Sequence, residues 1–206
     1  MKKPLSEVIV QASAMDGSDS WQSWPIGMGF EFLSYKDLFE TLQQGSHSKT
    51  LLCCFIAGSD DARRRNGMNR RMIENQLTLK GIYNLPFVRK EAYWRALLDH
   101  KFIISPEGNG IDCHRHYEAL MAGCIPIVED NPLTKQKYAG CPVVYTKSYM
   151  DISESKLKKI YETMLDQTYD FSCLFLSHYS EEQQKQIKQA GNFWLKKLGG
   201  KEDYYP

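Results

Sequence analysis

Residues 102–128 read FIISPEGNGIDCHRHYEALMAGCIPIV, and this stretch decides the fold. It opens on a short apolar run at residues 102–104 and closes on a second one at residues 125–128. Runs that are apolar on both faces are typical of strands buried inside a parallel sheet. Between them, residues 106–111 form a Gly-rich loop and residues 113–122 are predicted to be a short helix. The order strand, loop, helix, strand indicates a parallel crossover unit.

The same pattern extends to both sides of this stretch. Residues 51–57 form another continuous apolar run, LLCCFIA, and residues 143–145 are a candidate fourth strand. Helical patterns separate and follow the strands, at residues 61–76, 90–100, 153–166 and 181–198. We therefore predict an α/β fold, with a Rossmann-like parallel sheet and helices on both faces. Its neighbouring parallel strands should be residues 51–57, 102–105 and 125–128.

The remainder of the chain bounds the class of protein. Residues 1–48 show no comparably clear pattern, so we expect an N-terminal extension there and a Rossmann-like domain over residues 49–206. A net charge of +1 gives no bulk electrostatic reason to bind nucleic acid or an anionic membrane. No apolar stretch has the length of a signal-peptide core or a bilayer span. We expect a soluble protein without an integral membrane segment, cytoplasmic by default, or in the Golgi lumen if a targeting segment has been removed.

The six cysteines are expected to be free and mostly buried. No pair has the CxxC spacing of a zinc ribbon. Cys53 and Cys54 are adjacent on one predicted strand, so they point to opposite faces. We predict no disulfide between these two, nor between Cys113 and Cys124.

The Gly-rich loop and the helix after it carry the chemistry of a ligand site. Gly108 and Gly110, on either side of Asn109, let the backbone approach a ligand closely. The loop leads to a helix N-terminus, where free N–H groups and the helix dipole favour an anion. Arg115 and Glu118 are three residues apart and share a face of this helix. The guanidinium suits a diphosphate, and the carboxylate suits the hydroxyls of a ribose. The alternative is a solvated ion pair between the two.

This segment resembles the donor-binding core of exostosin-type glycosyltransferases. The matching positions are Pro106, Gly108, Arg115, Glu118, Ala119, Ala122, Gly123, Cys124, Ile125 and Pro126. The resemblance covers residues 49 to 165 and implies one half of a GT-B fold. It also implies that Arg115 contacts the nucleotide diphosphate and Glu118 the ribose. Complete GT-B enzymes have two such halves, so a second chain or domain is expected to supply the acceptor site.

Further residues are candidates for supporting roles. Arg63, Arg64 and Arg65 follow the first strand and either contact phosphate or form a solvated helix face. Sugar transfer needs a group that takes the proton of the acceptor hydroxyl, and the candidate bases in or beside the loop are Glu107, Asp112 and His114. Asp112 is alternatively the cap of the following helix. His114 and His116 point to different faces of that helix, so we expect no metal site.

These observations lead to one expected function and one rival. We expect a glycosyltransferase, independent of metal and without a cofactor, that transfers a sugar from a UDP- or GDP-linked donor to a glycan or other hydroxyl acceptor. The rival is a non-catalytic module that binds a nucleotide or another phosphorylated ligand.

Overall fold

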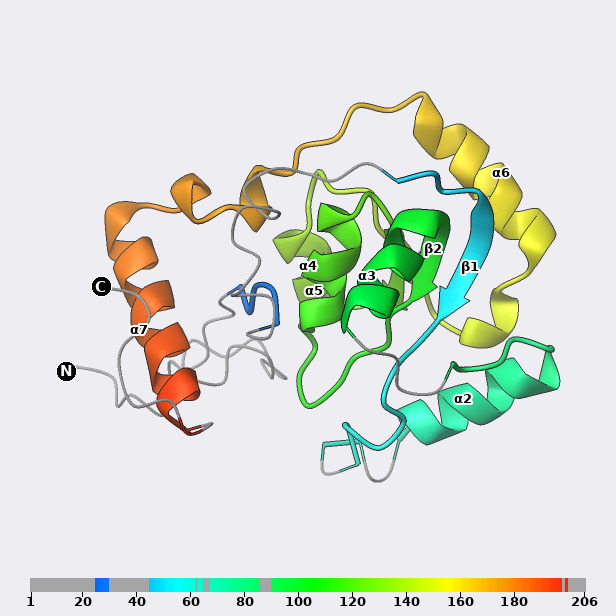
Figure 1. Cartoon of the computed structure of the whole chain (residues 1–206), viewed down its shortest axis with the longest axis horizontal. Helices are drawn as coiled ribbons and strands as arrows, with labels where there is room; N and C mark the ends of the chain where they lie inside the picture. The colour runs from blue at the N-terminus through cyan, green and yellow to red at the C-terminus, as the bar shows by residue number, and fades with distance from the viewer. Residues whose placement is uncertain are drawn as a thin grey trace.

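A four-stranded parallel sheet forms the centre of the molecule in the computed structural model, which describes residues 25–29, 45–61, 63–64, 67–85, 90–197 and 199 (Figure 1). Its strands lie side by side in chain order: β1 (Lys49–Cys53), β2 (His100–Ile104), β3 (Ile125–Glu129) and β4 (Val144–Thr146). All three neighbouring pairs are parallel. The α/β fold and the parallel arrangement expected for the first three strands are therefore confirmed. The first strand is shorter than the apolar run 51–57 and ends at Cys53.

Helices cover both faces of the sheet, because alternate strand residues point to opposite sides. Phe102 and Ile104 of β2 face one side, whereas Ile103 between them faces the other. The first side packs against α2 (Arg70–Leu79) and α6 (Glu154–Leu165). The second side packs against α3 (Lys90–Asp99) and α4 (His114–Met121). The buried residues of each side form a separate apolar cluster, as expected for a sheet between two helical layers.

The predicted helix over residues 61–76 is corrected, because α2 begins only at Arg70. Residues before it turn tightly instead. The backbone N–H groups of Arg63 and Arg64 both donate to the carbonyl of Asp60. The side chain of Asn69 accepts from the N–H of Met72 and caps the true start of the helix. Arg63 and Arg64 therefore lie in a turn between β1 and α2.

The helices α3, α4, α6 and α7 agree with the sequence pattern, whereas α5 and the short 3-10 helices were not predicted. Ser153 caps α6 by accepting from the N–H of Lys156, and Leu157 on the inner face of α6 is buried. After β3 and β4 come α5 (Pro132–Lys137) and the short 3-10 helix η2 (Tyr149–Asp151). The chain then passes through two more 3-10 helices, η3 (Ser172–Leu174) and η4 (Leu176–His178), to α7 (Glu181–Lys197). Figure 1 shows α7 on the side of the molecule away from α6.

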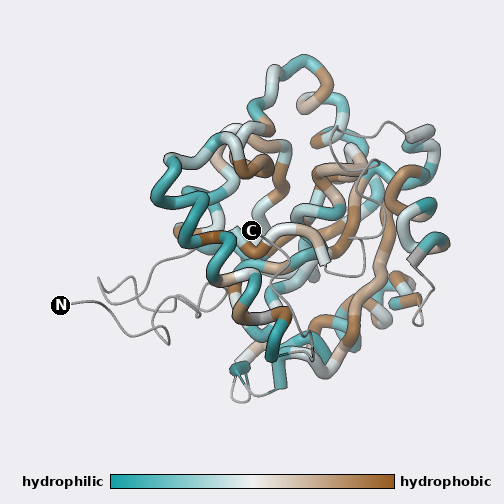
Figure 2. The backbone as a smooth tube through the Cα atoms, turned by 60° about the vertical axis from the view of Figure 1, so that its left-hand side comes forward, coloured by the Kyte–Doolittle hydropathy of each residue, from teal (hydrophilic) through white to brown (hydrophobic). Residues whose placement is uncertain are grey.

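Hydropathy separates the sheet from the last helix. Figure 2 shows α7 as hydrophilic along most of its length, whereas the strands are largely hydrophobic. Within the described part of the chain, no helix combines the length and apolar character needed to cross a membrane.

All six cysteines are free, including the two pairs for which no disulfide was predicted. The expected N-terminal extension lies outside the described residues, apart from residues 25–29 and 45–48.

Candidate functional site

The loops that follow β1, β2 and β3 meet at the carboxyl ends of these strands, where open α/β sheets bind ligands. Arg70, the first residue of α2, holds two of these loops together. Its guanidinium donates from Nε to the carbonyl of Glu107 over 2.9 Å and from Nη2 to that of Pro106 over 2.7 Å. Nη1 reaches back to Ser59 Oγ in the loop after β1. Burial lowers the pKa of Arg70, and the positive charge of Arg115 lowers it further. A buried cation therefore braces the site.

Arg63 points toward the Gly-rich loop. Its Nε donates to the carbonyl of Gly108 over 2.9 Å, and its Nη2 pairs with Glu107 Oε2 at 2.7 Å. Arg64 instead pairs with Glu129 at the end of β3 over 2.8 Å. Both guanidiniums are largely buried, with 13% and 15% of their side chains exposed, so they do not form a solvated face. Arg65 lies outside the described residues.

The Gly-rich loop is tightly turned. The N–H of Gly108 donates to the carbonyl of Gly110 over 2.9 Å, with Asn109 exposed between them. A Cβ atom on Gly108 would lie only 3.0 Å from Arg70 Nη2. Glycine at this position therefore lets the buried guanidinium approach the loop.

Arg115 lies in the first turn of α4 and reaches the end of β1. Its Nε donates to the carbonyl of Cys54 over 3.1 Å. Its Nη1 atom is buried and has no hydrogen-bond partner among the described residues. An unpaired buried donor costs about 1–3 kcal/mol, and more on a charged group. Arg115 therefore presents a buried, unused N–H donor at the N-terminus of a helix.

Glu118 lies one turn further along α4 and is buried, with 6% of its surface exposed. One carboxylate oxygen accepts from Tyr93 Oη over 3.1 Å, and the other accepts from the N–H of Gly29 over 3.3 Å. Burial raises the pKa of Glu118, while His114 and Arg115 oppose that rise. This environment does not match a solvated ion pair, and the contacts of the described residues include no ion pair between Arg115 and Glu118.

Asp112 is not the cap of α4. The N-cap residue is Cys113, whose side chain makes no capping hydrogen bond. The carboxylate of Asp112 instead accepts from Lys137 Nζ over 2.7 Å and from Tyr138 Oη over 2.5 Å. Burial by itself raises the pKa of Asp112, but the positive charge of Lys137 and the hydrogen bond from its ammonium oppose that rise, so the pKa lies well below its usual range. Asp112 thus anchors α5 to the start of α4.

The remaining base candidates differ in whether their side chains already have hydrogen-bond or ion-pair partners. The Glu107 carboxylate is occupied by Arg63 and by the amide of Asn131. His114 is half-buried, and its Nδ1 lies 2.8 Å from the carbonyl of Gly27. A carbonyl only accepts, so Nδ1 carries a proton, and in the neutral imidazole Nε2 is then the nitrogen that can accept one. His116 turns away toward the carbonyl of Ser105. No group of three or more metal-binding side chains was found among the described residues.

Sequence reasoning missed three residues of this arrangement. Arg70 was not among the candidate arginines, although its place at the end of a turn from Asp60 gives it the central position. Asp60 is fully buried and accepts from the N–H of Arg70. Tyr93 was not a candidate either, and its hydroxyl donates to Glu118. The available signal for Asp60 was a carboxylate that follows the apolar run 51–57 after only two residues.

Comparison with known proteins places this chain in a family. The model of the RXYLT1 C-terminal domain matches residues 36–190, which include β1 to α6 and the site residues described above except Gly27 and Gly29. No curated protein matches the chain in sequence. The match extends over most of the 206 residues. The chain belongs to the RXYLT1 C-terminal domain family, a xylosyltransferase family and therefore a family of glycosyltransferases.

Proposed function

We propose that this domain is the donor-binding half of a GT-B-type glycosyltransferase. It binds a UDP- or GDP-linked sugar, with xylose the sugar that the family indicates, and transfers it to a hydroxyl acceptor. The observation that carries this proposal is the buried, unpartnered Nη1 of Arg115. The finer resemblance to exostosin-type enzymes supports the same donor site.

A diphosphate fits this donor for three reasons. Its oxygens would satisfy Arg115 Nη1, whose desolvation is otherwise uncompensated. The N–H groups in the first turn of α4 and the helix dipole favour the same negative charge. The buried charge of Arg70 lies close enough to Arg115 for the two to interact, which adds to the positive potential. Gly108 and Gly110 allow the loop to approach the phosphates.

Glu118 is proposed to accept hydrogen bonds from the ribose hydroxyls. Each carboxylate oxygen has two lone pairs, so an oxygen that already accepts from Tyr93 or Gly29 can accept again. The two existing bonds hold the carboxylate in one orientation. Glu118 lies about one helical turn from Arg115, which matches the step from a diphosphate to its nucleoside.

The transfer requires stabilisation of the departing diphosphate and removal of a proton from the acceptor hydroxyl. The acceptor oxygen forms a bond to the sugar C1 as the bond from C1 to the diphosphate breaks, and the electron pair of that bond passes to the diphosphate. Arg115 and the start of α4 stabilise the developing charge. We propose His114 as the group that takes the acceptor proton, because the lone pair on Nε2 makes it an acceptor. Glu107 and Asp112 already hold internal cationic partners and are weaker candidates.

The acceptor side is proposed to come from a second domain or chain. The four strands described here form one sheet with one set of carboxyl-end loops. A GT-B enzyme places the acceptor across from such a half. The donor half would then bind nucleotide by itself, and efficient transfer would need the partner half.

A two-stage experiment tests this function. A thermal-shift screen with UDP, GDP and their xylose and glucose conjugates reports binding, because a ligand that binds only the native state raises the melting temperature. We expect UDP or GDP to raise it, and the xylose conjugate to raise it at least as much. Release of labelled xylose from that conjugate, to water or to an added glycan, then reports transfer. A nucleotide that binds without any turnover would favour the non-catalytic module, and no shift with any nucleotide would refute the donor site.

A further inference from the structure

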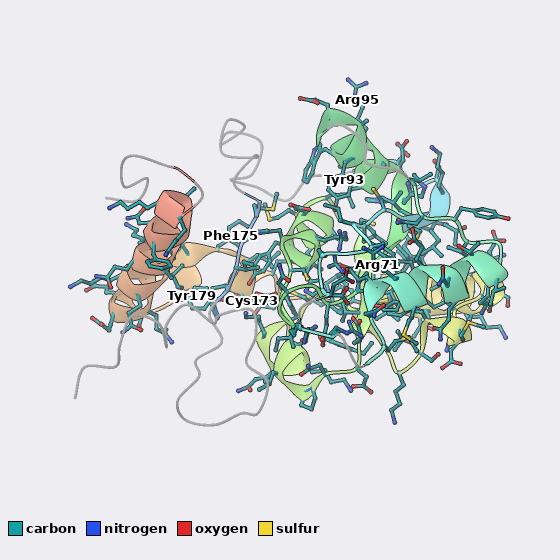
Figure 3. The ribbon with its side chains drawn as sticks, turned by 90° about the horizontal axis from the view of Figure 1, so that it is seen from below. Arg71, Tyr93, Arg95, Cys173, Phe175 and Tyr179 are labelled. Atoms are coloured by element: carbon teal, nitrogen blue, oxygen red, sulfur yellow. The ribbon has the colours of Figure 1, made fainter. Side chains whose placement is uncertain are left out.

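We propose that Cys141 and Cys173 are a dithiol pair that closes to a disulfide in an oxidising compartment and thereby fastens the segment before α7 to the sheet domain. This inference is independent of the proposed function. The two sulfur atoms lie 3.5 Å apart in the structure, while the residues are 32 positions apart in the chain. Cys141 follows α5, and Cys173 belongs to η3. Figure 3 labels Cys173, together with Phe175 and Tyr179, in the segment that leads to α7.

Independent contacts hold the two thiols in place. The N–H of Asp170 donates to the carbonyl of Gly140 over 3.0 Å, directly before Cys141. Cys141 Sγ also lies 3.3 Å from the carbonyl oxygen of Asp170. On the other side, Tyr179 Oη donates to the carbonyl of Cys173 over 2.8 Å. The backbones on both sides are thus fixed before any bond forms, so the thiols stay near each other.

Apolar packing fixes the same segment. Tyr117 and Leu120 on the outer side of α4 pack with Tyr138 after α5. Phe171 and Leu174, which flank Cys173, cover this cluster. A disulfide requires the sulfur atoms to approach to about 2 Å, which small side-chain rotations can achieve when the backbones are already close.

The pair is more exposed than three of the other four thiols, and Cys54 is the one other cysteine that is half-buried. Cys53, Cys113 and Cys124 are buried, whereas Cys141 and Cys173 are both half-exposed. A hydrogen bond from Cys141 lowers the pKa of Cys173, and the same bond together with burial raises the pKa of Cys141. Cys173 is therefore the thiol of the pair that more readily forms the reactive thiolate.

The reaction is a thiol–disulfide exchange with glutathione disulfide as the oxidant. The Cys173 thiolate attacks one sulfur of glutathione disulfide and releases a glutathione thiolate. Cys141 then loses its proton, and its sulfur attacks the sulfur of Cys173 in the mixed disulfide, releasing the second glutathione. Two protein thiols are oxidised to one disulfide, and glutathione disulfide is reduced to two glutathione thiols.

Alkylation and peptide mapping test the pair in the full chain. The protein is equilibrated in a glutathione buffer as oxidising as a secretory compartment, alkylated and digested. We expect two peptides, one with Cys141 and one with Cys173, joined by a disulfide. Their joint mass should be two hydrogen atoms less than the sum of the two reduced peptides, and the other four cysteines should be alkylated. The melting temperature should rise by about 5–10 °C over the reduced protein, because a cross-link over a loop of this length restricts the unfolded chain.

Three variants make the result specific. Cys141→Ser and Cys173→Ser should each abolish both the cross-linked peptide and the redox dependence of the melting temperature. Cys54→Ser, which replaces the other half-buried cysteine, should retain both. Six alkylated thiols in the oxidising buffer, a cross-link between other cysteines, or a stable glutathione adduct on a single cysteine would each overturn the proposal.

Discussion

Replacing Arg115 by methionine separates a ligand-binding role from a structural one. Methionine keeps an unbranched apolar stem and removes the guanidinium. The variant loses one hydrogen bond to the carbonyl of Cys54, worth about 1 kcal/mol net. It also removes the buried Nη1 donor, whose unmet hydrogen bond costs about 1–3 kcal/mol. The two terms nearly cancel, so the free energy of unfolding should change by less than about 1 kcal/mol or increase.

The affinity for the nucleotide, in contrast, should fall in this variant. A hydrogen bond to a charged group contributes about 1.5–3 kcal/mol, so Arg115→Met should weaken nucleoside diphosphate binding roughly 10- to 150-fold. Urea denaturation measures the first quantity and calorimetric titration the second. Arg95→Met is the matched control, since Arg95 is an exposed arginine on α3 that points away from the site (Figure 3). A variant that loses more than about 2 kcal/mol of stability and still binds the nucleotide normally would refute the reasoning.

Three other variants test neighbouring parts of the site. Glu118→Gln should weaken nucleoside diphosphate binding by about 1 kcal/mol and leave pyrophosphate competition unchanged in calorimetry, because pyrophosphate has no ribose. Asp112→Asn should lower the free energy of unfolding by about 2–4 kcal/mol at neutral pH, because it leaves the Lys137 ammonium without its buried carboxylate. The folded pKa of Asp112 is depressed, so its contribution is present above the unfolded pKa of about 4 and is lost as the pH falls toward the folded value. Urea denaturation should therefore show the wild type and Asp112→Asn converging in acid, and a constant difference would contradict this. Gly108→Ala should lower the free energy of unfolding by about 1–2 kcal/mol, since its Cβ would press on Arg70. An unchanged melting temperature would show that the contacts of Arg70 with this loop do not stabilise the fold.

The sheet was predictable from sequence because its strands are apolar on both faces. Residues 102–104 and 125–128 are short hydrophobic runs between helical patterns, which leaves few alternatives to parallel pairing. The helix expected over residues 61–76 was wrong in its first half, because a buried carboxylate competed with helix propensity. Asp60 accepts two backbone N–H groups at its carbonyl and one at its side chain, and this turn replaces the first helical turns.

The site shows where single-sequence reasoning ends. The placement of Arg115 and Glu118 on one face of α4 follows from helical spacing alone. Their partners come from segments distant in sequence: Cys54 for Arg115, and Gly29 and Tyr93 for Glu118. Such contacts depend on how loops pack at the carboxyl edge of the sheet. Composition and periodicity carry no information on that packing.

The contact between Cys141 and Cys173 could not be predicted from the sequence either. The sequence gives an even number of cysteines, and six cysteines allow many pairings. Only the docking of residues 170–174 against the end of α5 brings this pair together. The expectation of free thiols agrees with the structure, and the proposed cross-link concerns what an oxidant then does to one pair.

Calorimetric titration of the wild-type protein with UDP and with GDP, with and without excess inorganic pyrophosphate, tests the central claim most directly. The account predicts that at least one nucleoside diphosphate binds, that pyrophosphate competes with it, and that the binding heat disappears in Arg115→Met at the same concentrations. If neither nucleotide binds at about millimolar concentration, or if Arg115→Met binds as the wild type does, the diphosphate is not held at the start of α4 and the claim is contradicted.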